Sequence, residues 1–346
     1  MEIYAAYFTA LTCFNLALFT RQHLLTRTKR SPHTSPEGEE EESISLADLP
    51  DSPDKQAVWD FKRIYFGVYI LATAADWLQG PYIYTLYKDD KSLPEPTVAA
   101  LFTTGFVAAA TENLAVPSTT NSLSPSTEEK DHQQQSSATV QATYRDILCD
   151  GRLLTLAFTT TAFEGSMYLF VFFWSPALKA ARASSASARG VSLENAGENV
   201  PGLPFGLIFA SFMSAMMLGS MTTSAMNLTS NLKTSSRLTL HTVALATIAL
   251  VTPVLAKSSE TGVFWAFALF EICVGMYFPA MSKLKSEVVE EKVRGKVYGM
   301  MRVPLNLFVV LALGSTKEGD AYRHTMFRTA GTLLLIAFVV IARYLD

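Results

Sequence analysis

Three long apolar runs of this chain each contain a single acidic residue. Asp76 stands in the run 64–87, and Glu164 and Glu271 lie in the middle of two later runs. Apolar runs of about 20 residues are typical of helices that cross a membrane. A carboxylate at that depth costs about 3 kcal/mol or more, and such residues face a water-filled cavity, a charged partner or a proton pathway. The pattern predicts a polytopic membrane protein, with transport as the first functional hypothesis.

The bulk composition agrees with a membrane protein and disfavours a soluble one. Hydrophobic residues make up 49% of the 346 residues and charged residues 17%, with a mean hydropathy of +0.21. The net charge is -3, and the basic residues are scattered over short loops and form no stripe that would neutralise a phosphate backbone. We therefore expect the lipid bilayer as a partner and no nucleic acid.

The residues that mark enzymes and metal sites are sparse. The three cysteines, Cys13, Cys149 and Cys273, have no CxxC spacing, and we expect Cys13 and Cys273 to be packing residues. The five histidines do not cluster, and the sequence contains no glycine-rich phosphate loop and no GxSxG motif. We expect no metal, no cofactor, no catalytic residue and no enzymatic activity.

Nine segments are apolar enough to be read as membrane spans, although two of them are short. They cover residues 3–20, 65–87, 97–110, 153–177, 204–226, 238–256, 262–281, 303–315 and 327–344. The fold class expected from this pattern is all-α, a polytopic bundle of membrane helices. Small residues spaced four apart, Ser211, Ala215 and Gly219, predict close helix packing in the fifth span.

The distribution of lysine and arginine predicts an orientation in the membrane. The loop from Lys283 to Arg302 is the richest in basic residues and should be cytoplasmic. Alternation from there places the N-terminus outside and the C-terminus in the cytoplasm, with the first span as a permanent anchor. The segment 179–200 is expected to be an external loop. We expect a multi-pass protein of the plasma membrane.

Five stretches carry a resemblance to a known family. They are AADWLQGPY at 74–82, the Phe-Glu pair at 163–164 with Trp174 and Pro176, and the stretches at 206–209, 275–282 and 302–305. These stretches resemble the molybdate-anion transporter family of the major facilitator superfamily. The resemblance implies two six-helix halves, an added N-terminal helix, and inward transport of molybdate. The molybdate assignment comes from the resemblance and not from the residues.

The same resemblance indicates that about four helices of the first half are missing after residue 110. The expected divisions are an extra helix (1–20), an acidic disordered cytoplasmic linker (21–62), a two-helix remnant of the first half (63–110), a polar linker (111–150) and a complete second half (151–346). Alternating access rocks one half against the other. Three alternatives follow: a second copy or another chain supplies the missing wall, the sequence is an incomplete gene product, or the chain is an inactive isoform.

The acids and their neighbours are the candidates for a substrate or proton pathway. Asp76 is followed one turn later by Gln79, and Glu164 shares a helix face with Tyr168. Glu271 is a candidate for binding a proton. For each acid the alternative is a structural role, in which hydrogen bonds to neighbouring side chains fix the helix packing.

Arg302 is the candidate cation for an oxyanion, and Asn306 follows it one helical turn later. An oxyanion needs hydrogen-bond donors or positive charge, which the acids do not provide unless they are protonated. The alternative role of Arg302 is an anchor at the membrane interface. The ligands expected from these residues and from the resemblance are molybdate or a similar oxyanion, with protons as coupling ions.

Overall fold

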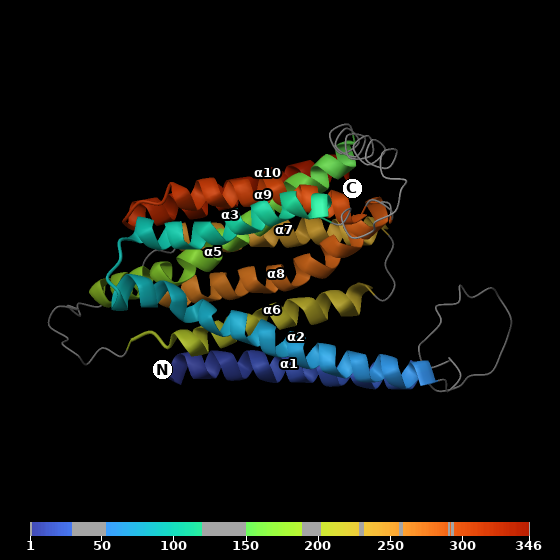
Figure 1. The fold of residues 1–346 in the computed structure, drawn as a ribbon. Helices are drawn as coiled ribbons and strands as arrows, with labels where there is room; N and C mark the ends of the chain where they lie inside the picture. Colours follow the sequence, from blue (N-terminus) through green and yellow to red (C-terminus); the bar gives the residue numbers. More distant parts are fainter. Residues whose placement is uncertain are drawn as a thin grey trace.

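The structure is a computed structural model that describes residues 2–29, 53–119, 150–188, 202–227, 232–255, 259–289, 291 and 294–345. The long elements in these ranges are all helices, and they run side by side in a bundle (Figure 1). They are α1 (Glu2–Lys29), α2 (Pro53–Thr85), a π-helical turn η1 (Leu86–Asp90), α3 (Glu95–Thr119), α5 (Gly151–Ala188), α6 (Phe205–Asn227), α7 (Leu232–Leu255), α8 (Glu260–Val288), α9 (Arg294–Gly314) and α10 (Asp320–Tyr344). The expected all-α fold is confirmed.

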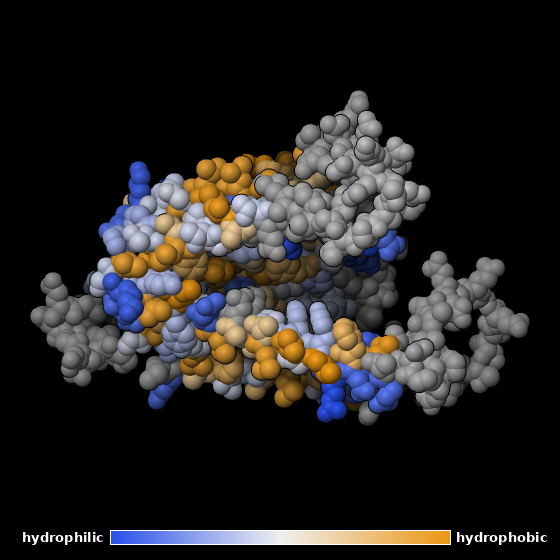
Figure 2. Space-filling view, viewed as in Figure 1, coloured by the Kyte–Doolittle hydropathy of each residue, from blue (hydrophilic) through white to orange (hydrophobic). Residues whose placement is uncertain are grey.

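Seven described helices are long and apolar enough to cross a membrane, which makes this a multi-pass membrane protein. They are Glu2–Leu24, Gly151–Ala188, Phe205–Met226, Thr234–Leu255, Glu260–Val288, Val297–Gly314 and Asp320–Tyr344. The other two expected spans, 65–87 and 97–110, fall on α2 and α3, which are helical but are not among these seven. Figure 2 shows apolar side chains along the middle of the bundle and strongly hydrophilic ones toward its ends.

Several helices continue beyond the apolar segments that predict them. Helix α1 extends to Lys29 and α3 to Thr119, into segments that we expected to be linkers. The expectation of an external loop from residue 179 is wrong for residues 179–188, because α5 continues to Ala188. This last part of α5 is rich in alanine, which favours a helix whether or not it lies in a membrane.

Helix α8 is the centre of the bundle and packs against α5, α6 and α7, while α10 packs against α5 and α7. The core of the bundle is rich in aromatic side chains. The largest fully buried side chains are Phe163, Phe170, Phe172 and Phe173 of α5, Phe212 of α6, and Phe264, Phe267, Phe270 and Tyr277 of α8. Rings of this size interlock in tilted and edge-to-face pairs, which holds the two central helices at a fixed distance.

The closest helix pair is α6 with α8, and glycine makes it possible. A Cβ atom on Gly219 would lie 2.0 Å from the carbonyl oxygen of Ile272, and one on Gly275 would lie 1.9 Å from that of Met216. Both contacts are with backbone, which cannot move without separating the helices. The close packing expected at Gly219 is confirmed, and Gly275 is its counterpart on α8.

Three side chains of α1 form hydrogen bonds with α6 and with the start of α8. Tyr4 donates to Glu260 at 2.5 Å, Asn15 to the backbone oxygen of Ser214 at 2.8 Å, and Gln22 to that of Met221 at 2.9 Å. These residues recur on one face of α1, whereas Cys13 is on another face and is exposed. The expectation that Cys13 is a packing residue is therefore wrong for the described chain.

Helix α2 makes few contacts over most of its length. Large apolar side chains from Trp59 (64% exposed) to Leu71 (73% exposed) are open on successive residues and therefore on every face of the helix. Only its C-terminal part approaches the bundle, where Gly80 lies against Phe209 of α6. Helix α3, in contrast, packs along α9.

Candidate functional site

A buried ion pair links α5 with α8. Lys285 Nζ lies 3.7 Å from Glu164 Oε1, and the two side chains are only 15% and 16% exposed. Both residues belong to helices that are long enough to span the membrane. Two buried charges are costly unless they are paired or bind a ligand, so this pair is the first candidate for a functional site.

Arg302 of α9 adds a second positive charge to the pair. It interacts electrostatically with Glu164, Lys285 and Tyr168. Arg302 is exposed, whereas Lys285 is partly buried. With two cations and one carboxylate, the group formed by Glu164, Lys285 and Arg302, which we name the cationic cluster, carries a net positive charge.

Two buried hydroxyl groups border the cationic cluster. The ring of Tyr277 stacks on Phe163 and directs its hydroxyl group to the neighbourhood of Glu164 and Thr160. The Tyr277 hydroxyl interacts with both Thr160 and Glu164. A buried hydroxyl group beside two cations is suited to donate a hydrogen bond to an anion.

Helix α3 also reaches this region. Its Phe106 meets the ring of Tyr168 edge to face, with centroids 4.8 Å apart. The helix face that the spacing predicts for Glu164 and Tyr168 is present in the structure, and Arg302 interacts electrostatically with both residues. Helix α3 forms part of their surroundings.

The remaining expected site residues lie elsewhere. Glu271 is 6% exposed on α8, and no described side chain forms an ion pair or hydrogen bond with it. Asn306 is 7% exposed on α9, one turn beyond Arg302. Gln79 is exposed on α2, away from the cluster. Asp76 is on the same helix, but its side chain lies outside the described residues.

Lys285 and Tyr277 were missed by the sequence reasoning, whereas Thr160 lies on the helix face that the spacing predicts for Glu164 and Tyr168. The span that holds Glu271 was expected to end at residue 281, which left Lys285 among the basic residues of a cytoplasmic loop. In the structure α8 continues to Val288, so Lys285 is part of the helix and turns toward α5. The available signal was a helical pattern that continues without glycine or proline from Ala280 to Val288.

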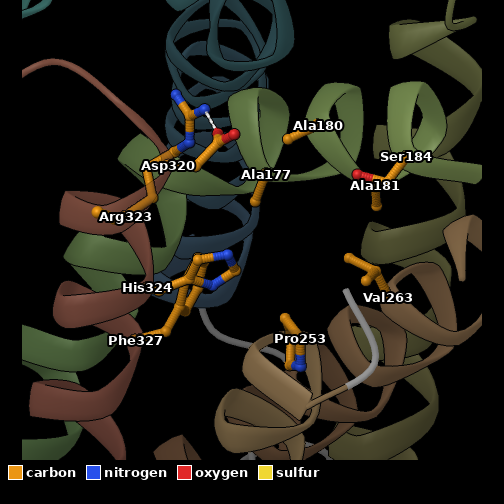
Figure 3. Close-up of a pocket in the computed structure, with 11 residues that line it drawn as sticks. Ala177, Ala180, Ala181, Ser184, Pro253, Val263, Asp320, Arg323, His324 and Phe327 are labelled. Atoms are coloured by element: carbon orange, nitrogen blue, oxygen red, sulfur yellow. Dashed lines mark hydrogen bonds and ion pairs between the residues drawn. The ribbon is translucent and has the colours of Figure 1, made fainter. Parts of the chain in front are cut away.

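A separate cavity of about 360 Å³ opens near the other end of the bundle, between α5, α7, α8 and α10. Figure 3 shows Asp320, Arg323 and His324 on one side of it and the small residues Ala177 and Ala181 of α5 on another. Arg323 and Asp320 form an ion pair at its rim. Among the described residues, no group of three or more His, Cys, Asp or Glu side chains is arranged to hold a metal ion.

Comparison with known proteins identifies the family. A family model described as "Sugar-transporters, 12 TM" matches residues 45–118 and 114–272, which together are more than half of the chain. The chain belongs to the transporter family that this model describes. It is similar to molybdate-anion transporters of Takifugu rubripes (28% identity over 57% of this chain and 40% of the relative), Danio rerio (29%, 58% and 40%) and Xenopus laevis (28%, 57% and 41%).

The facilitator chain described here spans about 40% of the length of these curated relatives. The family model matches in two segments that meet at residues 114–118. No solved structure gives a significant match to the chain.

Proposed function

We propose that this chain takes part in the uptake of molybdate or a similar oxyanion, and that the cationic cluster binds the anion. The observation that carries the proposal is the pair Glu164–Lys285, held 3.7 Å apart inside membrane helices with Arg302 nearby. The relatives named molybdate-anion transporters support the choice of substrate. Catalysis plays no part in this function, and no enzymatic activity is proposed.

The chemistry of the cluster suits a tetrahedral oxyanion with two negative charges. Lys285 and Arg302 provide two positive charges, and the hydroxyl groups of Tyr277 and Thr160 are further hydrogen-bond donors. At 3.7 Å the Glu164–Lys285 contact is longer than a charge-assisted hydrogen bond. Lys285 is therefore held only weakly by Glu164 and is available to bind an oxyanion that carries more charge.

Proton coupling is the second part of the proposal, with Glu271 as the proton-binding group. Its carboxyl group is buried in the centre of α8 and meets no positive side chain in the described part of the chain. Carboxyl groups in this position commonly take part in proton relays. Glu271 and Lys285 are separated by about 21 Å along α8 at 1.5 Å per residue, so proton and anion would bind at different sites.

The proposed organisation follows the family pattern with a shortened first half. Helix α1 would be the added helix, α2 and α3 the remnant of the first half, and α5 to α10 the second half, with about four helices missing between α3 and α5. The match in two segments that meet at residues 114–118 supports this division. We place the chain in the plasma membrane with the N-terminus outside and the C-terminus in the cytoplasm, on the strength of the basic residues from Lys283 to Arg302.

A second candidate function is that of a non-transporting chain that pairs with other membrane chains. The observation that favours it is helix α2, whose apolar side chains are exposed on every face over most of its length. Such a helix has lost its neighbours, and a second copy or a longer relative would supply them. A homo-oligomer is the simplest form of such an assembly.

Uptake by the purified chain separates the two functions. Liposomes that contain the full chain would be given molybdate, and the parent would be compared with Lys285→Gln and with Lys317→Gln as a matched control at an exposed loop position. Uptake by the parent and the control, with loss in Lys285→Gln, supports the transport function and the site. Absence of uptake by the parent favours the pairing function.

A further inference from the structure

Helices α1, α5 and α8 meet at one end of the bundle (Figure 1). The hydroxyl of Tyr4 in α1 donates to Glu260 Oε1 at 2.5 Å, and Glu260 is the first residue of α8. The backbone N–H of Glu260 donates at 3.0 Å to the hydroxyl of Ser185, which lies in the last turn of α5. Each of these helices is long and apolar enough to cross a membrane, so they meet at the level where the spans begin or end.

A cavity of about 370 Å³ lies at this meeting point, and we name it the interfacial pocket. Residues of all three helices line it: Ile3, Tyr4 and Tyr7 of α1, Ser185 of α5 and Glu260 of α8. It shares no lining residue with the cavity of Figure 3. Glu260 and Lys285 are separated by about 37 Å along α8 at 1.5 Å per residue, so the interfacial pocket is also far from the cationic cluster.

Charges of both signs border the interfacial pocket. Glu260 provides a carboxylate, and in the described part of the chain no lysine or arginine forms an ion pair with it. Arg182 of α5, one helical turn before Ser185, interacts electrostatically with Tyr4. A ligand that carries one positive and one negative group would therefore complement the pocket.

Aromatic rings lie beside the carboxylate. Tyr7 lines the pocket, stacks on Phe264 with ring centroids 5.1 Å apart, and meets the ring of Trp265 at 4.9 Å. Trp265 is 40% exposed. Tyrosine and tryptophan are enriched where membrane spans meet the head groups of lipids, and the faces of such rings attract quaternary ammonium groups. A tyrosine ring next to a carboxylate favours a choline group as the positive part of the ligand.

An exposed apolar stripe continues from the pocket along α1. Ile3 lines the pocket and is 59% exposed, and Phe14 is 54% exposed. Ala6 and Ala10 lie between them at helical spacing and are exposed as well, so the four residues share one face of the helix. A ligand with hydrocarbon chains attached to its charged group would cover this stripe.

We propose that the interfacial pocket binds a phospholipid with a phosphocholine head group. Glu260 and the Tyr7 ring receive the positively charged choline, Arg182 neutralises the phosphate, and the acyl chains follow the stripe from Ile3 to Phe14. The bound lipid would join α1, α5 and α8 at this end of the bundle. A phosphatidylglycerol head group has no positive charge to place beside Glu260, so it should bind more weakly.

Competition between two lipids tests this inference. The full chain would be purified in detergent, given equal amounts of phosphatidylcholine and phosphatidylglycerol with identical acyl chains, and analysed by native mass spectrometry. The parent should retain phosphatidylcholine about fivefold more often than phosphatidylglycerol, the scale expected for a cation–π contact together with a carboxylate. Equal retention of the two lipids by the parent would overturn the inference.

Two substitutions remove the choline contacts one at a time. Glu260→Gln and Tyr7→Leu should each reduce the preference to about twofold. Glu287→Gln and Tyr69→Leu, at exposed positions of α8 and α2, are the matched controls and should keep the parental preference. An unchanged preference in both pocket variants, each eluting as one species, would overturn the inference. If Tyr7→Leu aggregates, Glu260→Gln decides alone, because the amide keeps the size of the side chain.

Arg182→Gln tests the placement of the phosphate. Both lipids carry a phosphate, so this change should lower the retention of both by a similar factor and leave the preference intact. Arg343→Gln, an exposed arginine in the last turn of α10, is the matched control and should change neither quantity. A loss of preference in Arg182→Gln without a loss of total retention would overturn the proposed placement of the head group.

Soluble glycerophosphocholine distinguishes a lipid from a free head group. In large excess it should leave the bound phosphatidylcholine in place, because the acyl chains add apolar contacts that the soluble compound lacks. Displacement of the lipid by this compound would make the free head group the ligand and overturn the lipid as occupant. The readout is lipid retention, so it does not depend on whether the chain carries an oxyanion.

Discussion

Tyr277 of α8 lies flat on Phe163 of α5, with ring centroids 3.9 Å apart and ring planes 7° apart. Because Phe163 precedes Glu164 in the chain, this stack fixes the height of the Tyr277 hydroxyl relative to the Glu164 carboxylate. The stack is buried, so its geometry does not depend on solvent. The Tyr277 hydroxyl is thus held rigidly beside the cationic cluster.

Tyr277→Phe should separate binding from stability. The substitution keeps the ring stack and removes one hydroxyl that interacts with Glu164 and Thr160, so the free energy of unfolding should fall by about 1 kcal/mol at most. The affinity for an oxyanion should fall by about 1 kcal/mol, roughly fivefold, through loss of one donor. Binding measured by calorimetry checks the affinity. Equal affinity in the two proteins would remove Tyr277 from the anion site.

Gly219→Ala should destabilise the bundle by about 1–3 kcal/mol, because the new Cβ would collide with a backbone oxygen and force α6 away from α8. Thermal unfolding in detergent would record this as a lower melting temperature. Gly105→Ala is the matched control, since a Cβ there meets nothing within 4 Å and alanine is the better helix former. Equal melting temperatures for the two variants would contradict the close packing.

The contact between Lys88 of η1 and Glu318 should weaken in acid. The hydrogen bond from Lys88, followed by the backbone N–H of Glu95 and the positive charge of Lys88, holds the pKa of Glu318 below its usual value of 4.5. A carboxyl whose pKa is lowered by folding stabilises the protein above the ordinary pKa, and this stabilisation is lost as the pH falls through the lowered value. The parent should melt at a higher temperature than Glu318→Gln at neutral pH, and the difference should vanish in acid. Exposed Glu287→Gln serves as the charge-matched control, and a difference that persists in acid would assign the effect to another group.

Glu271→Gln should remove the pH dependence of uptake while expression stays normal. The amide has the same size as the carboxylic acid but cannot release a proton. Uptake would be compared at acidic and neutral external pH for the parent and the variant. A variant that retains the parental pH dependence would exclude Glu271 from proton coupling.

The native transcript should contain an additional coding stretch between the codons for Ala110 and Arg152. Four spans and their loops require roughly 100 residues or more. Sequencing of the transcript across this region is the measurement. Finding the stretch would assign transport to the longer product, whereas a continuous transcript would make the shortened chain real and favour its pairing with other chains.

Much of the fold was predictable from the apolar runs, because seven of the nine expected spans coincide with helices of membrane length. The helix ends were less accessible to prediction. The length of an apolar run indicates where the hydrocarbon core begins and ends. Helices α5 and α8 continue past that point through alanine, lysine, arginine, leucine and glutamate residues, which are good helix formers.

The candidate site was predictable only in part. Helical spacing joins Glu164 with Tyr168, and this holds in the structure. The pairing of Glu164 with Lys285 depends on how α5 and α8 are placed in three dimensions, and their 121-residue separation in the chain gives no local signal. A basic residue near a membrane boundary is usually explained by the positive-inside rule alone. For this reason Lys285 was assigned to a cytoplasmic loop and not to the site.

The hydrogen bonds that join α1 to α6 and α8 make α1 a suitable place for a label that reports helix movement. Tyr4, Asn15 and Gln22 bind this helix to α6 and α8 on three separate turns. A fluorophore near the start of α1 would therefore move together with α6 and α8. Paired with a second dye on the exposed part of α2, it would report movement of α2 relative to these helices as a change in energy transfer.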